Sequence, residues 1–249
     1  MTDKGREFQL QKNIIYEDEH MIVVYKPAGI ATQTARVGQQ DMVSELKNYL
    51  SRKPEHRGKG EPYLGVVHRL DQPVSGILVF AKNRKAAAGL SAQVSSKQMG
   101  KYYYAVIYGV PDREEERLEN YLYKDSGTNR SLVVKEDFPQ AKKAVLIYKK
   151  VRTMMILEKE QEVSLLEIQL LTGRHHQIRA QLSHGGMPLL GDSKYGSEKS
   201  KLLSREIGCR DVALCAYKLI VQHPVTKEEM IFERQPEEKI FLPFFTRGI

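Results

Sequence analysis

Apolar and polar positions alternate along the chain in short runs, which predict strands separated by turns. Residues 14–26 predict two strands around an acidic turn, ended by Pro27 and Gly29. Residues 63–83 predict strand, loop and strand, because apolar runs flank a polar insertion with a turn-forming proline. Further strands are predicted over residues 101–109, 144–151, 164–171, 212–223 and 228–235.

Apolar residues at helical spacing occur between these strands. They predict helices over residues 41–50, 84–98 and 174–184. The Gly185-Gly186 pair follows the third segment in the position of a C-terminal cap. Strands in runs with few helices between them predict an α+β fold, in which helices and loops flank a mainly antiparallel, mixed β-sheet.

Two segments have weaker patterns. Residues 52–61 are charged and contain glycine and proline, which predicts a mobile basic loop. Residues 111–143 predict a protruding hairpin, and the charge run at 112–119 is typical of a solvated face. No repeat and no interdomain linker is seen, so we expect a polar tail over residues 1–12 and a single domain over residues 13–249.

Composition and charge narrow the classes of partner. The chain has 249 residues, 41% of them hydrophobic, which is enough for a sizeable core, and a net charge of +8 favours polyanions. RNA, DNA and acidic membranes stay open on this basis. No apolar run reaches the length of a membrane span, the N-terminus carries no apolar leader, and the two cysteines are too few for a disulfide framework. We expect a cytoplasmic, monomeric protein that does not associate with membranes.

Asp71 is the first candidate for chemistry. It lies in the polar insertion between two apolar segments, where a carboxylate near a buried sheet needs a cationic or hydrogen-bonding partner. The alternative from local pattern is a turn-capping role. Arg179 is a plausible counter-ion, because it lies at the margin of the inward side of the helix predicted over residues 174–184. For His175, on that inward side, a core position is favoured.

Tyr103 shares one strand face with Ala105 and Ile107, so its ring packs in the core or lines a pocket where it can stack on a base. The histidines lack the spacing of helical zinc sites, and Gly58-Lys59-Gly60 lacks that of a phosphate loop. We therefore expect no metal and no nucleotide cofactor.

These motifs resemble the RluA family of RNA pseudouridine synthases. Its signature reads here as HRLDQPVSGILVFAK, ending at Lys82, and the likeness continues in KPAG from Lys26, in KYYYAVIYG and in the stretch from Thr172 to Gly196. The resemblance spans residues 14 to 235. It implies the pseudouridine synthase catalytic fold, a structured RNA substrate, ribosomal or transfer RNA, and no cofactor.

The resemblance also assigns roles. Asp71 matches the essential aspartate, Tyr103 the active-site tyrosine, Arg179 the basic partner of the aspartate, and Arg69 the arginine that helps displace the target base. His68, Arg174 and Gln177, in the same motifs, are expected to contribute to RNA binding.

The chain departs from the family in two places. Val74 stands where threonine is usual, so a loop hydroxyl is lost while a β-branched side chain is kept. No small S4-like RNA-binding domain is expected at the N-terminus, because strand patterns begin near Ile14.

The residues suit the reaction, which breaks the bond between the sugar C1′ and N1 of uracil and forms a bond from C1′ to C5. An ionised carboxylate attacks C1′ or removes the 2′ proton, and both routes stay open. The alternatives are a non-catalytic protein that binds or folds RNA with the same pocket, and a general basic nucleic-acid-binding domain that would also bind DNA.

Overall fold

A mixed β-sheet runs through the whole of the computed structural model, which describes residues 10–34, 38–56, 58 and 60–246. The strands lie in the order β1 (Ile14–Glu17), β2 (Met21–Lys26), β4 (Ser75–Ala81), β10 (Leu214–Gln222), β5 (Gly100–Tyr108), β9 (Gln161–Leu170), β8 (Lys142–Ile156), β6 (Glu115–Asp125) and β7 (Arg130–Val134). The short strand β3 (Gly65–Val66) pairs with β4, and β11 (Glu229–Glu233) pairs with β10. Among the described strands only β4 and β10 pair in parallel, which confirms the predicted α+β fold with a mainly antiparallel sheet.

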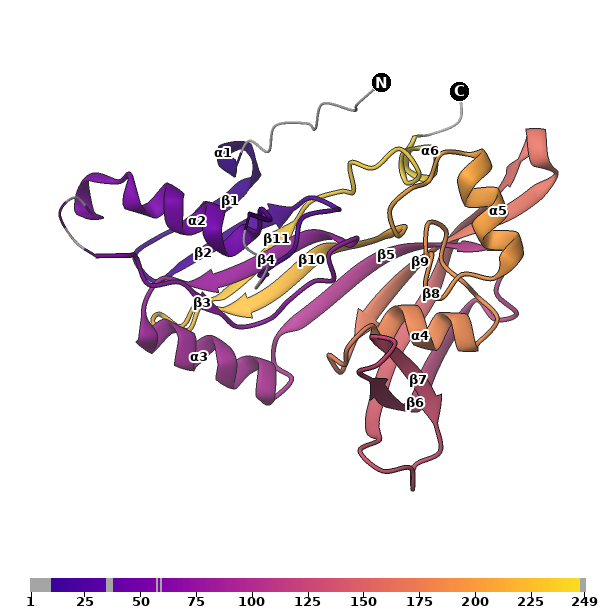
Figure 1. The fold of residues 1–249 in the computed structure, drawn as a ribbon, viewed down its shortest axis with the longest axis horizontal. Helices are drawn as coiled ribbons and strands as arrows, with labels where there is room; N and C mark the ends of the chain where they lie inside the picture. Colours follow the sequence, from indigo (N-terminus) through magenta and orange to yellow (C-terminus); the bar gives the residue numbers. More distant parts are fainter. Residues whose placement is uncertain (1–9, 35–37, 57, 59, 247–249) are drawn as a thin grey trace.

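Helices cover both faces of this sheet (Figure 1). The helices are α1 (Leu10–Asn13), α2 (Met42–Ser51), α3 (Arg84–Ser95), α4 (Gln177–His184), α5 (Glu198–Glu206) and α6 (Leu242–Phe245), with 3-10 turns η1 (Pro54–His56) and η2 (Leu157–Lys159). Apolar residues of α2 and α4 pack into one core cluster, and those of α3, α5 and α6 pack into the other. The side chains of the central strands β2, β4, β10, β5 and β9 therefore divide between two cores.

Strand β2 illustrates this division. Ile22 and Val24 pack on the side of α2 and α4, whereas Met21 and Val23 pack on the side of α3. Successive side chains of a strand point to opposite faces, so a continuous apolar run is what a sheet covered on both faces requires. Tyr103 lies with the first group, on the face that also holds the candidate site.

The helix starts follow from capping residues. The Asp41 side chain accepts a hydrogen bond from the Ser44 N–H before α2, and Asn83 accepts one from the Ala86 N–H before α3. Helix α4 differs, because its N-cap residue His176 has φ +49 and makes no side-chain capping bond. The helix predicted from residue 174 therefore begins at Gln177, and residues 174–176 form a tight entry loop.

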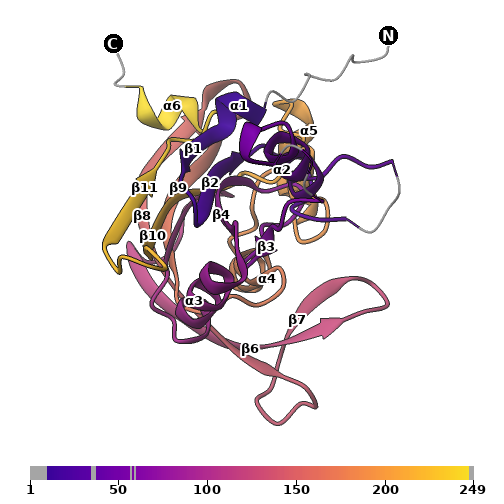
Figure 2. The same cartoon turned by 90° about the vertical axis from the view of Figure 1, so that its left-hand side faces the viewer.

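The segment over residues 111–143 forms the predicted hairpin, which projects from the body of the molecule (Figure 2). The charge run at residues 112–119 is exposed or half-buried throughout, as predicted for a solvated face, and from Glu115 it forms the start of β6, which pairs with β8. Residues 57 and 59 of the predicted basic loop, and most of the predicted polar tail, lie outside the described residues. Among the described residues no helix has both the length and the apolar character needed to cross a bilayer.

Candidate active site

The candidate carboxylate Asp71 lies on a tight loop between β3 and β4. The Asp71 carbonyl accepts a hydrogen bond from the Val74 N–H at 3.0 Å, which closes a β-turn. Just before Asp71, the Leu70 carbonyl accepts from the Thr32 hydroxyl at 3.0 Å, and the Leu70 N–H donates to the same hydroxyl at 3.2 Å. Hydrogen bonds to the backbone therefore hold the loop on both sides of Asp71.

Val74 and Gly76 fix the exit of this loop. Val74 is 2% exposed and packs in the core, and the turn bond uses only its backbone N–H. The turn therefore closes without a hydroxyl at position 74. Gly76 has φ +128, and a Cβ there would lie 2.4 Å from the backbone nitrogen and oxygen of Ala216. Only glycine allows β4 to approach β10 this closely.

Lys26, at the end of β2, ties the loop to the neighbouring turn. Its side chain is fully buried and donates to the carbonyls of Pro27 at 2.9 Å, Ile30 at 2.7 Å and Gln72 at 3.1 Å. Burial lowers the pKa of Lys26 to about 7. The nearby charge of Asp71 opposes this shift, because it favours the ammonium form. The three carbonyl acceptors use all three protons of an ammonium group.

Arg179, on α4, joins two carboxylates. Its Nε and Nη2 donate to the two oxygens of Asp192 at 2.7 and 2.8 Å, and its Nη1 donates to Asp71 Oδ2 at 3.1 Å. The Asp192 side chain is fully buried, whereas that of Asp71 is 27% exposed. The buried carboxylate thus fixes the guanidinium in a two-bond geometry, and the guanidinium in turn restrains the carboxylate that faces solvent.

The electrostatics keep this pair charged. Burial lowers the pKa of Arg179, but the hydrogen bonds and charges of Asp192 and Asp71 outweigh it and raise the pKa overall. Burial raises the pKa of Asp192, but Arg179 and the N–H groups of Lys194 and Tyr195, both at 3.0 Å, bring it below its usual value. Both groups are therefore ionised at neutral pH.

The backbone leading to Asp192 passes between two strands. Leu190 bonds through its N–H to β5 and through its carbonyl to the residue before β10. Gly191 has φ +71, and a Cβ there would lie 1.8 Å from the Asp211 carbonyl oxygen. A glycine is therefore required immediately before Asp192, which fixes the carboxylate beneath Arg179.

His176 is the second group beside Asp71. Its Nε2 lies 3.6 Å from Asp71 Oδ2, and its Nδ1 lies 2.9 Å from the Tyr195 hydroxyl, which accepts from the Ser131 N–H at 2.6 Å. The arrangement that uses every polar atom has the Tyr195 proton directed to Nδ1 and the imidazole proton on Nε2, facing the carboxylate. Burial lowers the pKa of His176 to about 4, although the nearby charge of Asp71 acts in the opposite direction. The ring is therefore neutral at pH 7.

Tyr103, on β5, is 6% exposed and packs in the same core cluster as Ala105 and Ile107. Burial and the charge of Asp71 raise its pKa, so the phenol is protonated at neutral pH. Its hydroxyl makes no hydrogen bond within the part of the chain that the structure describes. Among the described residues, every fully buried polar side-chain atom has a hydrogen-bond partner. Because the Tyr103 hydroxyl has none, it is not fully buried.

The other residues singled out from the sequence divide into two groups. His68 Nε2 accepts from the Val79 N–H at 3.1 Å, and burial lowers the pKa of the ring to about 3, so this histidine is neutral and supports β4. Gln177 is buried and bonds to the Val145 carbonyl at 3.1 Å and the Thr172 hydroxyl at 2.8 Å. The geometry gives both residues a positioning function.

Arg69 and Arg174 are exposed. The Arg174 Nε donates to the Lys143 carbonyl at 2.9 Å. Arg69 precedes Asp71 and makes no hydrogen bond or ion pair with the described residues. Of the two, Arg69 is therefore the freer to contact a ligand.

Reasoning from sequence missed His176, Asp192 and Tyr195. His175 was expected on the helix, but it precedes α4, is only half-buried and stacks on His176 with ring centroids 3.7 Å apart. A signal was present for all three, since they lie in the stretch from Thr172 to Gly196 that carries the family resemblance.

Comparisons with known proteins identify the family and the fold. Residues 20–184 match the family model described as RNA pseudouridylate synthase. The chain is 37% identical over 223 residues to an uncharacterized RNA pseudouridine synthase of Bacillus subtilis (strain 168), covering 89% of this chain and 67% of the relative. It is 32% identical over 235 residues to ribosomal large subunit pseudouridine synthase D of Zymomonas mobilis subsp. mobilis, covering 93% and 71%. The solved structure of human RNA Pseudouridylate Synthase Domain Containing 4 has the same fold, with a TM-score of 0.72, 23% identity and coverage of 94% and 92%.

Proposed function

Because the chain belongs to the RluA-type RNA pseudouridine synthases, isomerases that act on uridine in RNA, we propose that it uses Asp71 to convert specific uridines of structured ribosomal or transfer RNA. The observation that carries this proposal is the asymmetry of the Asp71 carboxylate. Oδ2 faces Arg179 and His176, whereas Oδ1 makes no hydrogen bond or ion pair with the described residues. One oxygen is thus restrained and the other is available to a substrate. The Zymomonas mobilis relative, named for the ribosomal large subunit, favours ribosomal RNA.

The proposed chemistry rearranges one nucleotide without transferring a group to or from the RNA. The C1′–N1 bond breaks, the uracil turns, and a C1′–C5 bond forms, while C5 loses its proton and N1 gains one. Asp71 attacks C1′ or removes the 2′ proton. Both routes need an ionised carboxylate, and the Arg179 guanidinium orients that carboxylate by donating to its Oδ2 at 3.1 Å. Tyr103, whose phenol is protonated at neutral pH, is assigned to stack on the uracil and to assist loss of the C5 proton.

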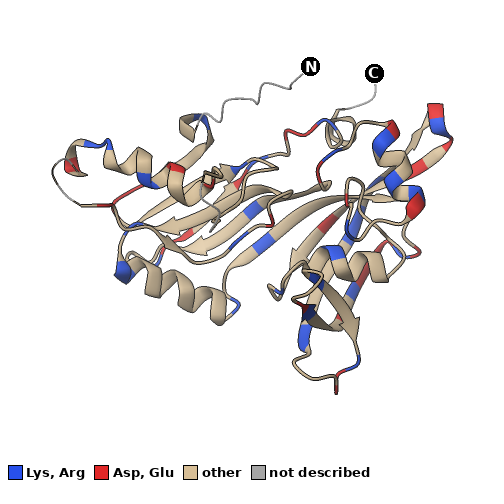
Figure 3. Ribbon diagram, viewed as in Figure 1, with Lys and Arg blue, Asp and Glu red and all other residues tan. Residues whose placement is uncertain are grey.

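Access to the sugar requires the uridine to leave its helical stack, which costs a few kcal/mol. The exposed Arg69 beside Asp71 is positioned to fill the space that the base vacates. Lys and Arg occur along α5 and the β6–β7 hairpin (Figure 3), and phosphate contacts from such residues offset the cost of base flipping.

The test uses RNA labelled with tritium at C5 of uridine and isolated from cells that lack this protein. Release of tritium to water is compared between the wild type, Asp71→Asn and Asp137→Asn. Asp137 is exposed and remote from the described site contacts, so Asp137→Asn is a matched carboxyl-to-amide control. We expect release by the wild type and the control, and none by Asp71→Asn.

RNA affinity is measured in parallel. If Asp71→Asn binds RNA as the wild type does while neither releases tritium, the chain is an RNA-binding protein without this activity and the proposal fails. Release by Asp71→Asn at the wild-type rate would remove Asp71 from the mechanism.

A further inference from the structure

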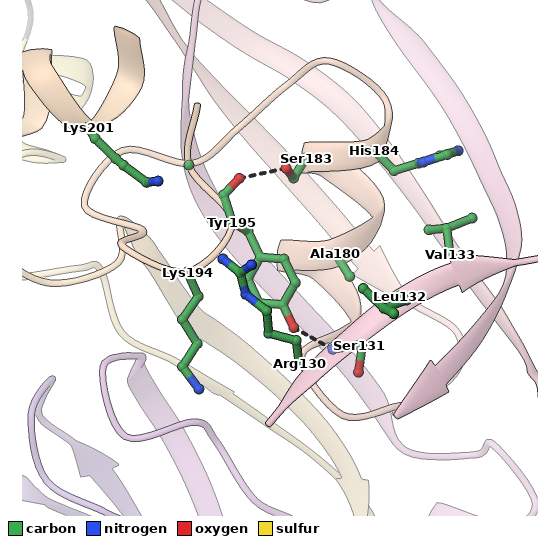
Figure 4. A pocket seen from close by; sticks show the side chains of 11 residues that line it. Arg130, Ser131, Leu132, Val133, Ala180, Ser183, His184, Lys194, Tyr195 and Lys201 are labelled. Carbon is green, nitrogen blue, oxygen red and sulfur yellow. Dashed lines mark hydrogen bonds between the residues drawn. The ribbon is translucent and has the colours of Figure 1, made fainter. Parts of the chain in front are cut away.

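A cleft beside the candidate active site has Tyr195 in its lining, and Tyr195 is also part of that site. It has a volume of about 400 Å³, and its walls come from β7, the C-terminal half of α4, the segment 194–196 and α5 (Figure 4). Asp71, Arg179 and His176 do not line it. The cleft is therefore separate from the carboxylate site and adjoins it through one aromatic ring.

The lining of this cleft is cationic. Arg130, Lys194 and Lys201 line it, and no Asp or Glu does. Within the described residues Arg130 and Lys194 form no ion pair, and the Lys194 Nζ donates only to the Asn129 carbonyl at 3.0 Å. Lys201 lies 3.2 Å from a carboxylate oxygen of Glu198, whose side chain is 91% exposed. These charges are largely uncompensated, so the cleft favours an anion.

The cleft also offers apolar and aromatic surface. The Arg130 guanidinium lies 5.5 Å from the centroid of the Tyr195 ring, and Leu132 and Val133 line the same wall. Figure 4 shows Arg130 against the Tyr195 ring, with Lys201 reaching toward this segment from α5. Cations beside aromatic and apolar side chains suit a nucleotide of a single strand, because the phosphate and the base are bound together.

Tyr195 links this cleft to Asp71 by short distances. Its hydroxyl lies 2.9 Å from His176 Nδ1, and His176 Nε2 lies 3.6 Å from the Asp71 carboxylate. An RNA strand whose target uridine lies at Asp71 therefore has a neighbouring nucleotide close to Tyr195.

We propose that this cleft binds the backbone phosphate and sugar of a nucleotide next to the target uridine in the substrate strand. The inference rests on the proposed function for the identity of the RNA, but binding in the cleft is measurable without catalysis. Arg130 and Lys201 are the contacts that distinguish the cleft from the carboxylate site.

The test compares two double variants in an Asp71→Asn background, so that turnover does not complicate binding. Arg130→Gln with Lys201→Gln removes two charges from the cleft. Lys135→Gln with Lys199→Gln is the matched control, since these exposed lysines lie near β7 and on α5 but do not line the cleft. Binding of a fluorescein-labelled ten-residue oligouridylate is followed by anisotropy between about 50 and 200 mM salt.

We expect the cleft pair to weaken binding about tenfold and to reduce the slope of log affinity against log salt by about 1.4, because each single-strand phosphate contact contributes about 0.7. The control pair should change the slope by less than half as much. In an otherwise wild-type chain, the cleft pair should raise KM for tritium release and leave kcat unchanged. Arg130→Lys, which keeps the charge, should retain the slope.

Equal slopes for the two pairs, or no binding by the parent chain, would overturn the inference. Uridine monophosphate is added as a competitor to identify the source of the phosphate. Weak displacement supports a strand subsite, whereas full displacement that depends on Arg130 would assign the cleft to a free nucleotide. Absence of tritium release by the wild type would reject the proposed function. The binding comparison would still show whether RNA binds in the cleft.

Discussion

Asp71 and Asp192 bind the same guanidinium but differ in burial. Replacing Asp192 by asparagine should therefore have the larger effect on stability, and replacing Asp71 the larger effect on activity. In Asp192→Asn, the buried Arg179 loses the charge that holds two of its donors. Removing one partner of a buried ion pair costs about 3–5 kcal/mol, because the remaining charge is left uncompensated. In Asp71→Asn, Arg179 keeps Asp192, and the lost partner is 27% exposed. The expected cost is about 1 kcal/mol or less.

Urea unfolding measures this difference. With a denaturant slope of about 2–3 kcal/mol/M, Asp192→Asn should lower the unfolding midpoint by about 1–2.5 M and Asp71→Asn by less than about 0.5 M. Tritium release should rank the variants the other way. Asp71→Asn should have no activity, whereas Asp192→Asn, assayed where it is folded, should retain release reduced by up to about a hundredfold through misplacement of Arg179.

Two results would refute this reasoning. Equal destabilisation by the two substitutions would mean that Arg179 does not depend on the buried carboxylate more than on the exposed one. Full activity of Asp192→Asn, together with an unchanged midpoint, would mean that the fixed guanidinium has no role in either property. Asp137→Asn provides the baseline for a carboxyl-to-amide change on the surface.

Three further predictions concern the groups around this pair. Lys26→Met leaves three carbonyls without their shared donor and should lower the free energy of unfolding by about 3 kcal/mol in urea titrations; an unchanged midpoint would contradict this. Tyr195→Phe removes the hydroxyl between Ser131 and His176 and should lower kcat for tritium release about tenfold, whereas an unchanged kcat would exclude a positioning role. His176 has a pKa of about 4 in the folded chain and about 6.5 when unfolded, so only the unfolded chain gains a proton as pH falls between these values. The stability that His176 contributes should then fall by up to about 3 kcal/mol from pH 7 to pH 4, so His176→Gln should show a smaller fall than the wild type; parallel curves would refute it.

The sheet was predictable because most of its strands are buried on both faces. Continuous apolar runs of the length seen at residues 21–25 and 75–81, bounded by polar turn residues, are typical of strands in a doubly covered sheet. The hairpin was predicted but the bounds of β6 were not, because its side chains alternate between exposed and half-buried and its pairing with β8 depends on backbone hydrogen bonds. Helix α5 was missed for a related reason, since its buried residues are only Leu203 and two serines.

The candidate site was predictable as far as motifs specify residue types. Asp71, Arg179 and Tyr103 were singled out, and the structure brings the first two into direct contact. His176 escaped notice because its position depends on a left-handed backbone at residue 176, for which neighbouring residues give no signal. Asp192 is brought beneath α4 by a tertiary contact that periodicity cannot reveal.

The polar groups around Asp71 differ in how many of their hydrogen-bonding atoms are already paired within the protein. Lys26 uses its donors on backbone carbonyls, and Arg179 commits two donor atoms to Asp192 before one reaches Asp71. These bonds orient the carboxylate without saturating it, so Oδ1 keeps its lone pairs. Groups that are fixed in advance need no reorganisation when a ligand approaches. The fixed groups Lys26, Arg179 and Asp192 come from segments far apart in the chain, so the geometry around Asp71 depends on the packing of β2, α4 and the segment at Asp192 around one sheet.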